Sequence, residues 1–138
     1  HGAVRLAAVR AVDDVAGAPL ESVGRDLQSH PAFEHGVNVG FAHAEDAATV
    51  RLRVLERGVG ETAACGTGAC AAVAALRARG LVDAEVAVHL PGGVLTVRET
   101  DGTLELEGPA QITAVLAADD ARLAGIGPLA ADGWSAAT

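Results

Sequence analysis

A run of small apolar residues, 69–76 (ACAAVAAL), constrains the fold of this 138-residue chain more than any other feature. The run predicts a helix over 69–79, which ends at Gly80. A helix with almost no polar face is buried rather than laid on a surface. Because its residues are mostly Ala, strands can approach it closely. The rest of the chain is therefore expected to pack around it.

Short segments rich in Val, Leu and Ala lie on both sides of this run in the sequence. We expect strands over 4–12, 37–43, 49–55, 85–90, 94–99, 104–107 and 112–116, and a short amphipathic helix over 20–27. Asp101-Gly102 predicts a hairpin turn between two of the strands. The pattern favours an α+β domain over residues 1–117, centred on the buried helix. Residues 118–138 lack clear periodicity and are expected to form a loosely ordered tail.

Composition excludes several classes of function. The net charge is −8 and every basic residue other than His is Arg, so a general nucleic-acid binder is disfavoured. Without Lys the chain offers neither a pyridoxal Schiff base nor the lysine of a phosphate-binding P-loop. The sequence shows neither an apolar run of roughly 20 residues nor an export signal. We therefore expect a cytoplasmic protein without membrane contact.

The stretch from Glu56 to Thr67 carries the pattern most typical of a reactive site. Cys65 stands at the start of the predicted buried helix, just before Gly66-Thr67-Gly68. Free backbone N–H groups at a helix amino terminus favour anions, such as a substrate carboxylate. The same environment is expected to lower the pKa of a thiol. Arg57 could pair with a carboxylate and Glu56 with an ammonium group.

Ordinary structural roles compete with each of these interpretations. A cysteine in an Ala-rich run is usually a small core residue, which is our prediction for Cys70. A Glu-Arg pair at a strand end is often a surface feature, and Asn38 alone would be a strand-edge or turn residue. Cys65 and Cys70 would lie about 140° apart around a helix, so a disulfide is disfavoured. The scattered histidines show no metal-ligand spacing and are expected to be solvated: His30, His35, His43 and His89.

Four blocks of the sequence together resemble the carboxy-terminal half of diaminopimelate epimerase. They are 38–41 (NVGF), 53–72 (RVLERGVGETAACGTGACAA), 90–95 (LPGGVL) and 108–110 (GPA). The resemblance runs in order from about Val9 to Leu116. It implies a barrel of antiparallel and mixed strands around the central helix. An alternative is that the barrel is incomplete at its amino end.

The resemblance also implies a reaction. Members of this family invert an α-carbon without a cofactor, using one cysteine as thiolate base and another as thiol acid on the opposite face. Carried over by position, Cys65 resembles the second cysteine, and Glu56 is placed to act on its proton. Gly66 and Thr67 resemble the groups that bind the α-carboxylate. Asn38, Glu56 and Arg57 resemble further substrate contacts. No metal is implied, and the substrate would be LL- or meso-2,6-diaminopimelate.

Some features of the family pattern are absent from this chain. The other catalytic cysteine belongs to the amino-terminal half, and 4–7 (VRLA) stand where the family has Gly-Asn-Pro-His. An epimerase would therefore need a partner chain with the amino-terminal half, or a homodimer that places two copies of Cys65 across a two-fold axis. The sequence leaves two alternatives open. One is a truncated or divergent member that binds or assembles without catalysis, and the other is an isomerase of another amino acid.

Overall fold

The computed structural model describes residues 7–108, 112–117 and 134–137, with side chains described for 7–108. The elements in chain order are β1 (Ala7–Ala11), α1 (Leu20–Gln28), β2 (Asn38–Asp46), β3 (Thr49–Glu56), β4 (Gly60–Thr62), α2 (Gly66–Ala78), β5 (Glu85–Leu90), β6 (Gly93–Thr100), β7 (Thr103–Glu107), β8 (Ile112–Ala117) and β9 (Trp134–Ala137).

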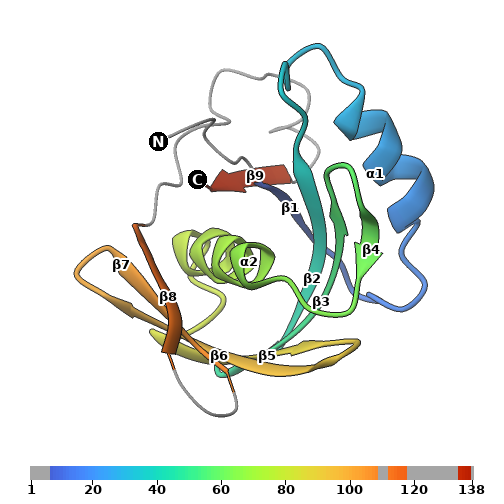
Figure 1. Cartoon of the computed structure of the whole chain (residues 1–138). Coiled ribbons are helices and arrows are strands. Elements are labelled where there is room, and N and C mark those ends of the chain that lie inside the picture. The colour runs from blue at the N-terminus through green and yellow to red at the C-terminus, as the bar shows by residue number, and fades with distance from the viewer. Residues whose placement is uncertain (1–6, 109–111, 118–133, 138) are drawn as a thin grey trace.

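The strands form one mixed sheet in the order β8-β7-β6-β5-β3-β2-β1-β9, with the short β4 paired to β3 outside this path. The β1–β2 and β3–β5 pairs are parallel, and the other pairs are antiparallel. Figure 1 shows the sheet curling around α2, which lies along the concave side. This arrangement confirms the predicted α+β domain with strands around a central buried helix.

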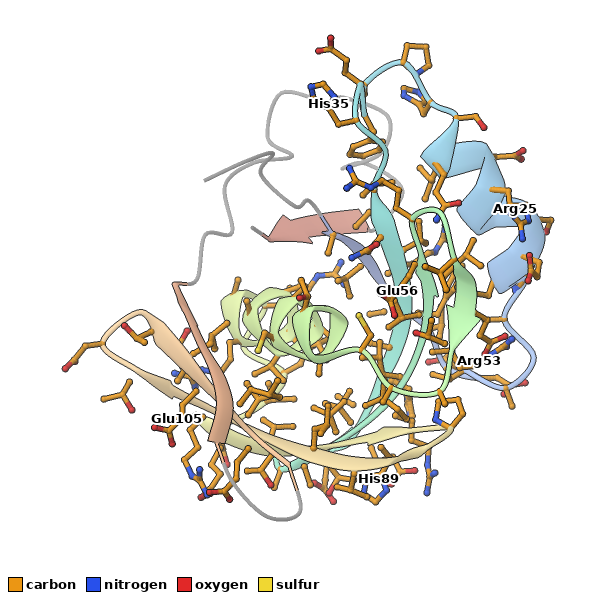
Figure 2. The ribbon with its side chains drawn as sticks, viewed as in Figure 1. Arg25, His35, Arg53, Glu56, His89 and Glu105 are labelled. Carbon is orange, nitrogen blue, oxygen red and sulfur yellow. The ribbon has the colours of Figure 1, made fainter. Side chains whose placement is uncertain are left out.

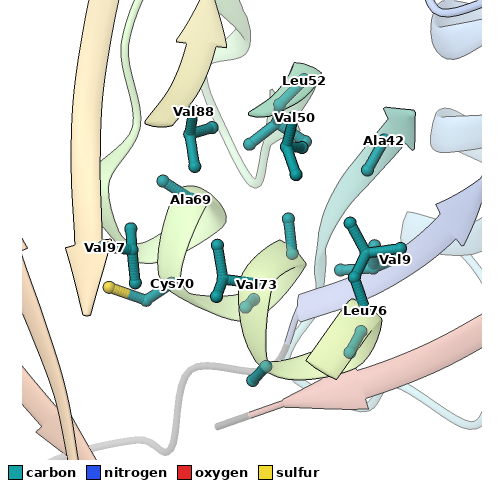
Figure 3. Close-up of a cluster of buried hydrophobic side chains, with 14 of the residues drawn as sticks. Val9, Ala42, Val50, Leu52, Ala69, Cys70, Val73, Leu76, Val88 and Val97 are labelled. Carbon is teal, nitrogen blue, oxygen red and sulfur yellow. The ribbon is translucent and has the colours of Figure 1, made fainter. Parts of the chain in front are cut away.

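The core fills the space between α2 and the concave face of the sheet (Figure 3). Every residue of α2 from Gly68 to Leu76 is buried. The sheet contributes alternate residues of its strands, among them Val50, Leu52 and Val54 of β3 and Val86 and Val88 of β5. Because successive strand residues point to opposite faces, this alternation turns Arg51 and Arg53 to the other side of β3.

A second, smaller core lies on the outer face of the sheet, beneath α1. Its apolar members come from α1, β1, β2, β3 and the segment after α1: Ala8, Leu20, Leu27, Phe33, Val37, Val39, Phe41 and Leu55. The helix approaches closely because Gly24 faces Leu55, where an added Cβ would stand 2.6 Å from Leu55 Cδ2. At the end of α1, Gln28 Nε2 donates to Leu55 O at 3.3 Å. These contacts fix the end of β3, which carries Glu56.

Most predicted elements are present with shifted ends. The predicted strand over 85–90 has those bounds, and Asp101 (φ 51°) and Gly102 (φ 79°) form the predicted turn between β6 and β7. Two successive left-handed residues are the signature of a tight hairpin. Helix α2 begins at Gly66 rather than Ala69, and β4 lies in a stretch for which no strand was predicted. Glycine favours neither element. Pairing with β3 forms β4, and close packing of Gly66 against β7 and of Gly68 against β3 accompanies the earlier start of α2.

Two predictions reach beyond the described residues. Positions 4–6 of the first predicted strand and 118–133 of the predicted tail lie outside them, so the division at residue 117 stays a prediction. Within the predicted tail, Trp134–Ala137 forms β9, which pairs with β1. Among the described helices, none is long and apolar enough to cross a membrane.

Candidate active site

Cys65 is the residue that caps α2. Its backbone is extended (φ −146°, ψ 104°), and its Sγ accepts a hydrogen bond from the Gly68 N–H at 3.2 Å. The Cys65 carbonyl accepts the first helical bond, from Ala69 N at 2.9 Å. This is the arrangement of an N-cap residue, with sulfur in the place of the usual side-chain oxygen. The sequence therefore located Cys65 correctly, at the mouth of the buried helix.

The pKa of Cys65 lies above its ordinary value. Burial is the largest cause, because the side chain is only 6% exposed and a thiolate is poorly solvated there. Hydrogen bonds from the Gly68 and Thr67 amides lower the pKa, whereas the negative charge of Glu56 and its hydrogen bond to the thiol raise it. The expected lowering of the Cys65 pKa is therefore wrong for this chain, because burial and Glu56 outweigh the amides at the helix terminus.

Glu56 and Asn38 reach the site from adjacent strands. Glu56 is the last residue of β3 and Asn38 the first of β2, and the two strands pair antiparallel with Val39 opposite Leu55. Figure 2 shows Glu56 beside the start of α2, which agrees with its influence on the Cys65 thiol. Asn38 Oδ1 accepts a hydrogen bond from the Arg57 backbone N–H at 2.8 Å. Four of the predicted residues are thus linked to one another. Asn38 is bonded to Arg57, Arg57 follows Glu56 in the chain, and Glu56 acts on Cys65.

The Arg57 side chain packs against the segment between α1 and β2. Its guanidinium donates to the His35 carbonyl. Gly36 has a left-handed backbone (φ +80°), and an added Cβ there would stand 2.4 Å from Arg57 Cδ. The Arg57 guanidinium, which was predicted to pair with a substrate carboxylate, therefore contacts a backbone carbonyl in this structure. His35 and Gly36 were missed because a carbonyl acceptor and a packing glycine leave no signal in one sequence.

An ion pair between Arg53 and Glu61 holds β4 against the rest of the site, and sequence reasoning did not single it out. Two N–H groups of Arg53 donate to the two Glu61 oxygens at 2.8 Å each. The bidentate pair lowers the pKa of Glu61 and raises that of Arg53. Arg53 also donates to the carbonyls of Val15, Ala16 and Ala18. The pair fixes the hairpin that leads to the segment before Cys65.

The remaining sequence candidates have structural roles. Cys70 is 2% exposed within the core (Figure 3), where burial raises its pKa to about 11. Both cysteines are free, as expected. His30 and His35 are exposed as predicted, but His43 and His89 are half-buried, and His43 Nδ1 lies 2.9 Å from the Val12 carbonyl, so these two are not simply solvated. Across the described residues, no group of three or more His, Cys, Asp or Glu side chains could hold a metal ion.

Comparison with known proteins identifies relatives of this chain. The profile of the family described as Diaminopimelate epimerase matches residues 7–113. The diaminopimelate epimerase of Halorhodospira halophila is 56% identical over 90 residues, which are 65% of this chain and 31% of that protein. That of Xanthomonas axonopodis pv. citri is 55% identical over 100 residues, 70% of this chain and 35% of that protein.

Among solved structures, a phenazine biosynthesis protein of the PhzF family from Bacillus anthracis is similar, with a TM-score of 0.48 and 23% sequence identity. The likeness covers 71% of this chain and 33% of that chain. On the strength of the profile match, the chain belongs to the diaminopimelate epimerase family. It spans about a third of the length of the curated relatives that it matches.

Proposed function

We propose that this chain supplies one of the two acid/base cysteines of a diaminopimelate epimerase, an isomerase that needs no cofactor. The observation that carries the proposal is the position of Cys65: its sulfur caps α2 and contacts Glu56, within the sequence block that matches the family. The substrate class is a small amino acid with two carboxylates, LL- or meso-2,6-diaminopimelate, and the reaction belongs to lysine biosynthesis.

In the proposed reaction Cys65 begins as the acid. Burial and Glu56 keep its proton in place, so the thiol can give that proton to the α-carbon from one face. A thiolate on the opposite face removes the original α-proton, because inversion needs removal and delivery on opposite sides. After one turnover Cys65 is the thiolate and the other cysteine is the thiol. The Thr67 and Gly68 amides, which lower the pKa of Cys65, stabilise that thiolate.

The same groups suit substrate binding. The first turn of α2, at Gly66 and Thr67, is proposed to hold the α-carboxylate, where N–H groups and the helix dipole favour an anion. Asn38, Glu56 and Arg57 are proposed to hold the rest of the substrate. Because Asn38 Oδ1 is already bonded to Arg57 N, its amide nitrogen is the end that can donate to a substrate oxygen.

The proposed reaction also needs a second cysteine on the opposite face of the substrate from Cys65. We propose that it comes from an amino-terminal half of the family's fold or from a second copy of this chain. Native mass spectrometry with and without a candidate partner distinguishes these sources, since a homodimer forms from this chain alone.

Protection of Cys65 from alkylation tests the proposed binding site. In a Cys70→Ala background, iodoacetamide reports on Cys65 alone. We expect meso-diaminopimelate to slow its modification in a saturable way. 1,5-Diaminopentane, which has the same two amines but neither carboxylate, should give no protection. Equal protection by both compounds, or by neither, would contradict a site built for the α-carboxylate.

A further inference from the structure

The segment between β4 and α2, residues 63–65, leads to the candidate catalytic thiol. Cys65 is held by its burial and by its bonds to α2, whereas the two residues before it have few anchors of their own. Ala63 and Ala64 are exposed. Among the backbone hydrogen bonds of the described chain, the one that reaches this segment from outside α2 runs from Gly92 N to Ala63 O at 2.7 Å. Gly92 lies in the turn between β5 and β6, about 30 residues further along the sequence. A distant turn therefore holds the segment that ends at Cys65.

Position 92 requires glycine because there is no room for a side chain, not because of its backbone conformation. An added Cβ would stand 2.8 Å from Ala63 O, 2.9 Å from Ala63 Cβ and 3.2 Å from Ala63 C. The φ of Gly92 lies outside the left-handed region, so alanine could adopt the same backbone without strain. Its neighbour Gly93 differs in both respects, with φ at +150° and nothing within 4 Å of an added Cβ.

The turn that presents Gly92 is itself firmly held. Leu90 at the end of β5 is 8% exposed within the core and pairs with Gly93 at the start of β6. Pro91 fixes its own φ, which leaves the two-residue turn little freedom. A contact from this turn therefore positions Ala63 relative to the sheet. One residue separates Ala63 from Cys65, so a displacement of the first is passed to the second.

We propose that Gly92 is a positioning residue for Cys65. Its N–H and its missing side chain set the distance of residues 63–65 from the β5–β6 turn, and thereby the burial of the thiol and its contact with Glu56. The catalytic meaning of this role rests on the proposed function, since displacing a reacting group by about 1 Å can cost about 10²-fold in rate. The structural role stands on the contacts alone.

The test compares Gly92→Ala with Gly102→Ala, both in a Cys70→Ala background. Gly102 has a left-handed backbone in the remote β6–β7 turn and nothing within 4 Å of an added Cβ. Its substitution costs stability without touching the site. The readout is the rate of Cys65 alkylation by iodoacetamide from pH 7 to 10.5. We expect Gly92→Ala to expose the thiol and lower its apparent pKa by at least about half a unit, equivalent to about threefold more thiolate at pH 8.

Gly102→Ala should leave the alkylation profile unchanged. Ala63→Gly is a second variant for the case that Gly92→Ala does not fold, because Ala63 is exposed and its substitution loosens the same segment. It should shift the profile in the same direction. Profiles for Gly92→Ala and Ala63→Gly that match that of Gly102→Ala would overturn the inference.

Failure of the proposed function is separable from failure of this inference. If the wild-type chain and an added amino-terminal half do not exchange the α-hydrogen of diaminopimelate, the proposed function fails, while the alkylation profiles still decide the role of Gly92. If exchange occurs and Gly92→Ala keeps both the wild-type rate and the wild-type profile, the role of Gly92 alone is wrong.

Discussion

Cys65 is subject to opposing influences that come from different parts of the structure. The first turn of α2 offers N–H groups that stabilise a thiolate, whereas burial and the Glu56 carboxylate stabilise the thiol. In the chain alone, burial and Glu56 have the larger effect on the pKa of Cys65. A substrate that displaces the Glu56 interaction would shift this balance, so Glu56 is the residue through which the proton of Cys65 can be tuned.

Replacing Glu56 with Gln should lower the pKa of Cys65. The carboxylate raises this pKa by its charge and by accepting the thiol hydrogen bond, and an amide keeps the shape without the charge. At pH 8 a larger fraction of Cys65 is then thiolate, so alkylation becomes faster. Glu105→Gln is the matched control, because Glu105 lies on β7 well away from Glu56 (Figure 2). Equal alkylation rates in the two variants would show that Glu56 does not act on this proton.

Asn38 is expected to contribute to stability as well as to binding. Asn38→Ala removes the acceptor of the Arg57 N–H and should lower the free energy of unfolding by about 0.5–1.5 kcal/mol. Asn38→Asp keeps an oxygen at that position and should retain most of this stability, yet lose binding because it has no amide donor. Urea unfolding and the protection of Cys65 by meso-diaminopimelate measure the two effects. A stability loss as large in Asn38→Asp as in Asn38→Ala would refute this assignment.

For single residues, the sequence predicted which side chains lie near Cys65 but not the direction in which the pKa of Cys65 is shifted. Asn38, Glu56 and Arg57 could be placed near Cys65 because a family resemblance supplies their relation across strands. The pKa of Cys65 could not be predicted, since it depends on burial by groups from separate elements. The contacts of Arg57 with His35 and Gly36 were missed because they depend on a loop path that local sequence does not determine.

Among the elements, the start of α2 is shaped by glycines that admit close neighbours. An added Cβ at Gly66 would stand 2.5 Å from Leu106 Cδ2 on β7, and one at Gly68 would stand 2.8 Å from Val54 Cγ2 on β3. Two strands therefore contact the first turn from different directions. This packing fixes the helix terminus on which Cys65 and the proposed carboxylate site depend.

Gly68→Ala should destabilise the protein, the reverse of the usual effect inside a helix. Alanine normally gains about 1 kcal/mol over glycine there. Here the new methyl group would overlap the stiff, β-branched Val54 side chain, and overpacking costs about 1–3 kcal/mol. In a Val54→Ala background the overlap with residue 54 is relieved and the 3.2 Å approach to Cys65 Sγ remains, so the same substitution should cost less than in the wild-type background. Urea unfolding of the four proteins measures the coupling, and a stabilising Gly68→Ala in the wild-type background would contradict the packing argument.

The elements show where periodicity is a sufficient guide. The alternation in β3 and the unbroken apolar run in α2 predicted a strand and a buried helix, because burial dictates those patterns. Strand β4 was not predicted, since Gly60–Thr62 is too short and too polar for periodicity to reveal. It forms because it pairs with β3 and because Arg53 holds Glu61.

Across the whole molecule, one central helix organises most of the core. The larger hydrophobic cluster surrounds α2, and the smaller one seats α1 on the outer face of the sheet. The chain has only three aromatic residues, Phe33, Phe41 and Trp134. Stability therefore depends on many small contacts of Ala, Val and Leu, and a cavity beside α2 is expected to be costly.

Leu76→Ala should lower the free energy of unfolding by about 2–5 kcal/mol, as expected for a leucine that is 1% exposed in the core. Leu81→Ala is the matched control, because Leu81 follows the same helix but is 47% exposed. Its effect should stay within about 0.5 kcal/mol. Equal losses in the two variants, measured by urea unfolding, would show that α2 is not the centre of the core.

The central claim is that Cys65 moves a proton at the α-carbon of diaminopimelate. The direct measurement follows the α-hydrogen signal of LL- and meso-diaminopimelate by NMR in deuterium oxide. It uses the chain alone and the chain with the amino-terminal half of a related epimerase, each as wild type and as Cys65→Ala. The account predicts loss of the α-hydrogen signal together with interconversion of the LL and meso forms in the wild-type mixture, and no interconversion with Cys65→Ala. Interconversion that persists without Cys65, or α-hydrogen exchange that is absent from every wild-type sample, would contradict it.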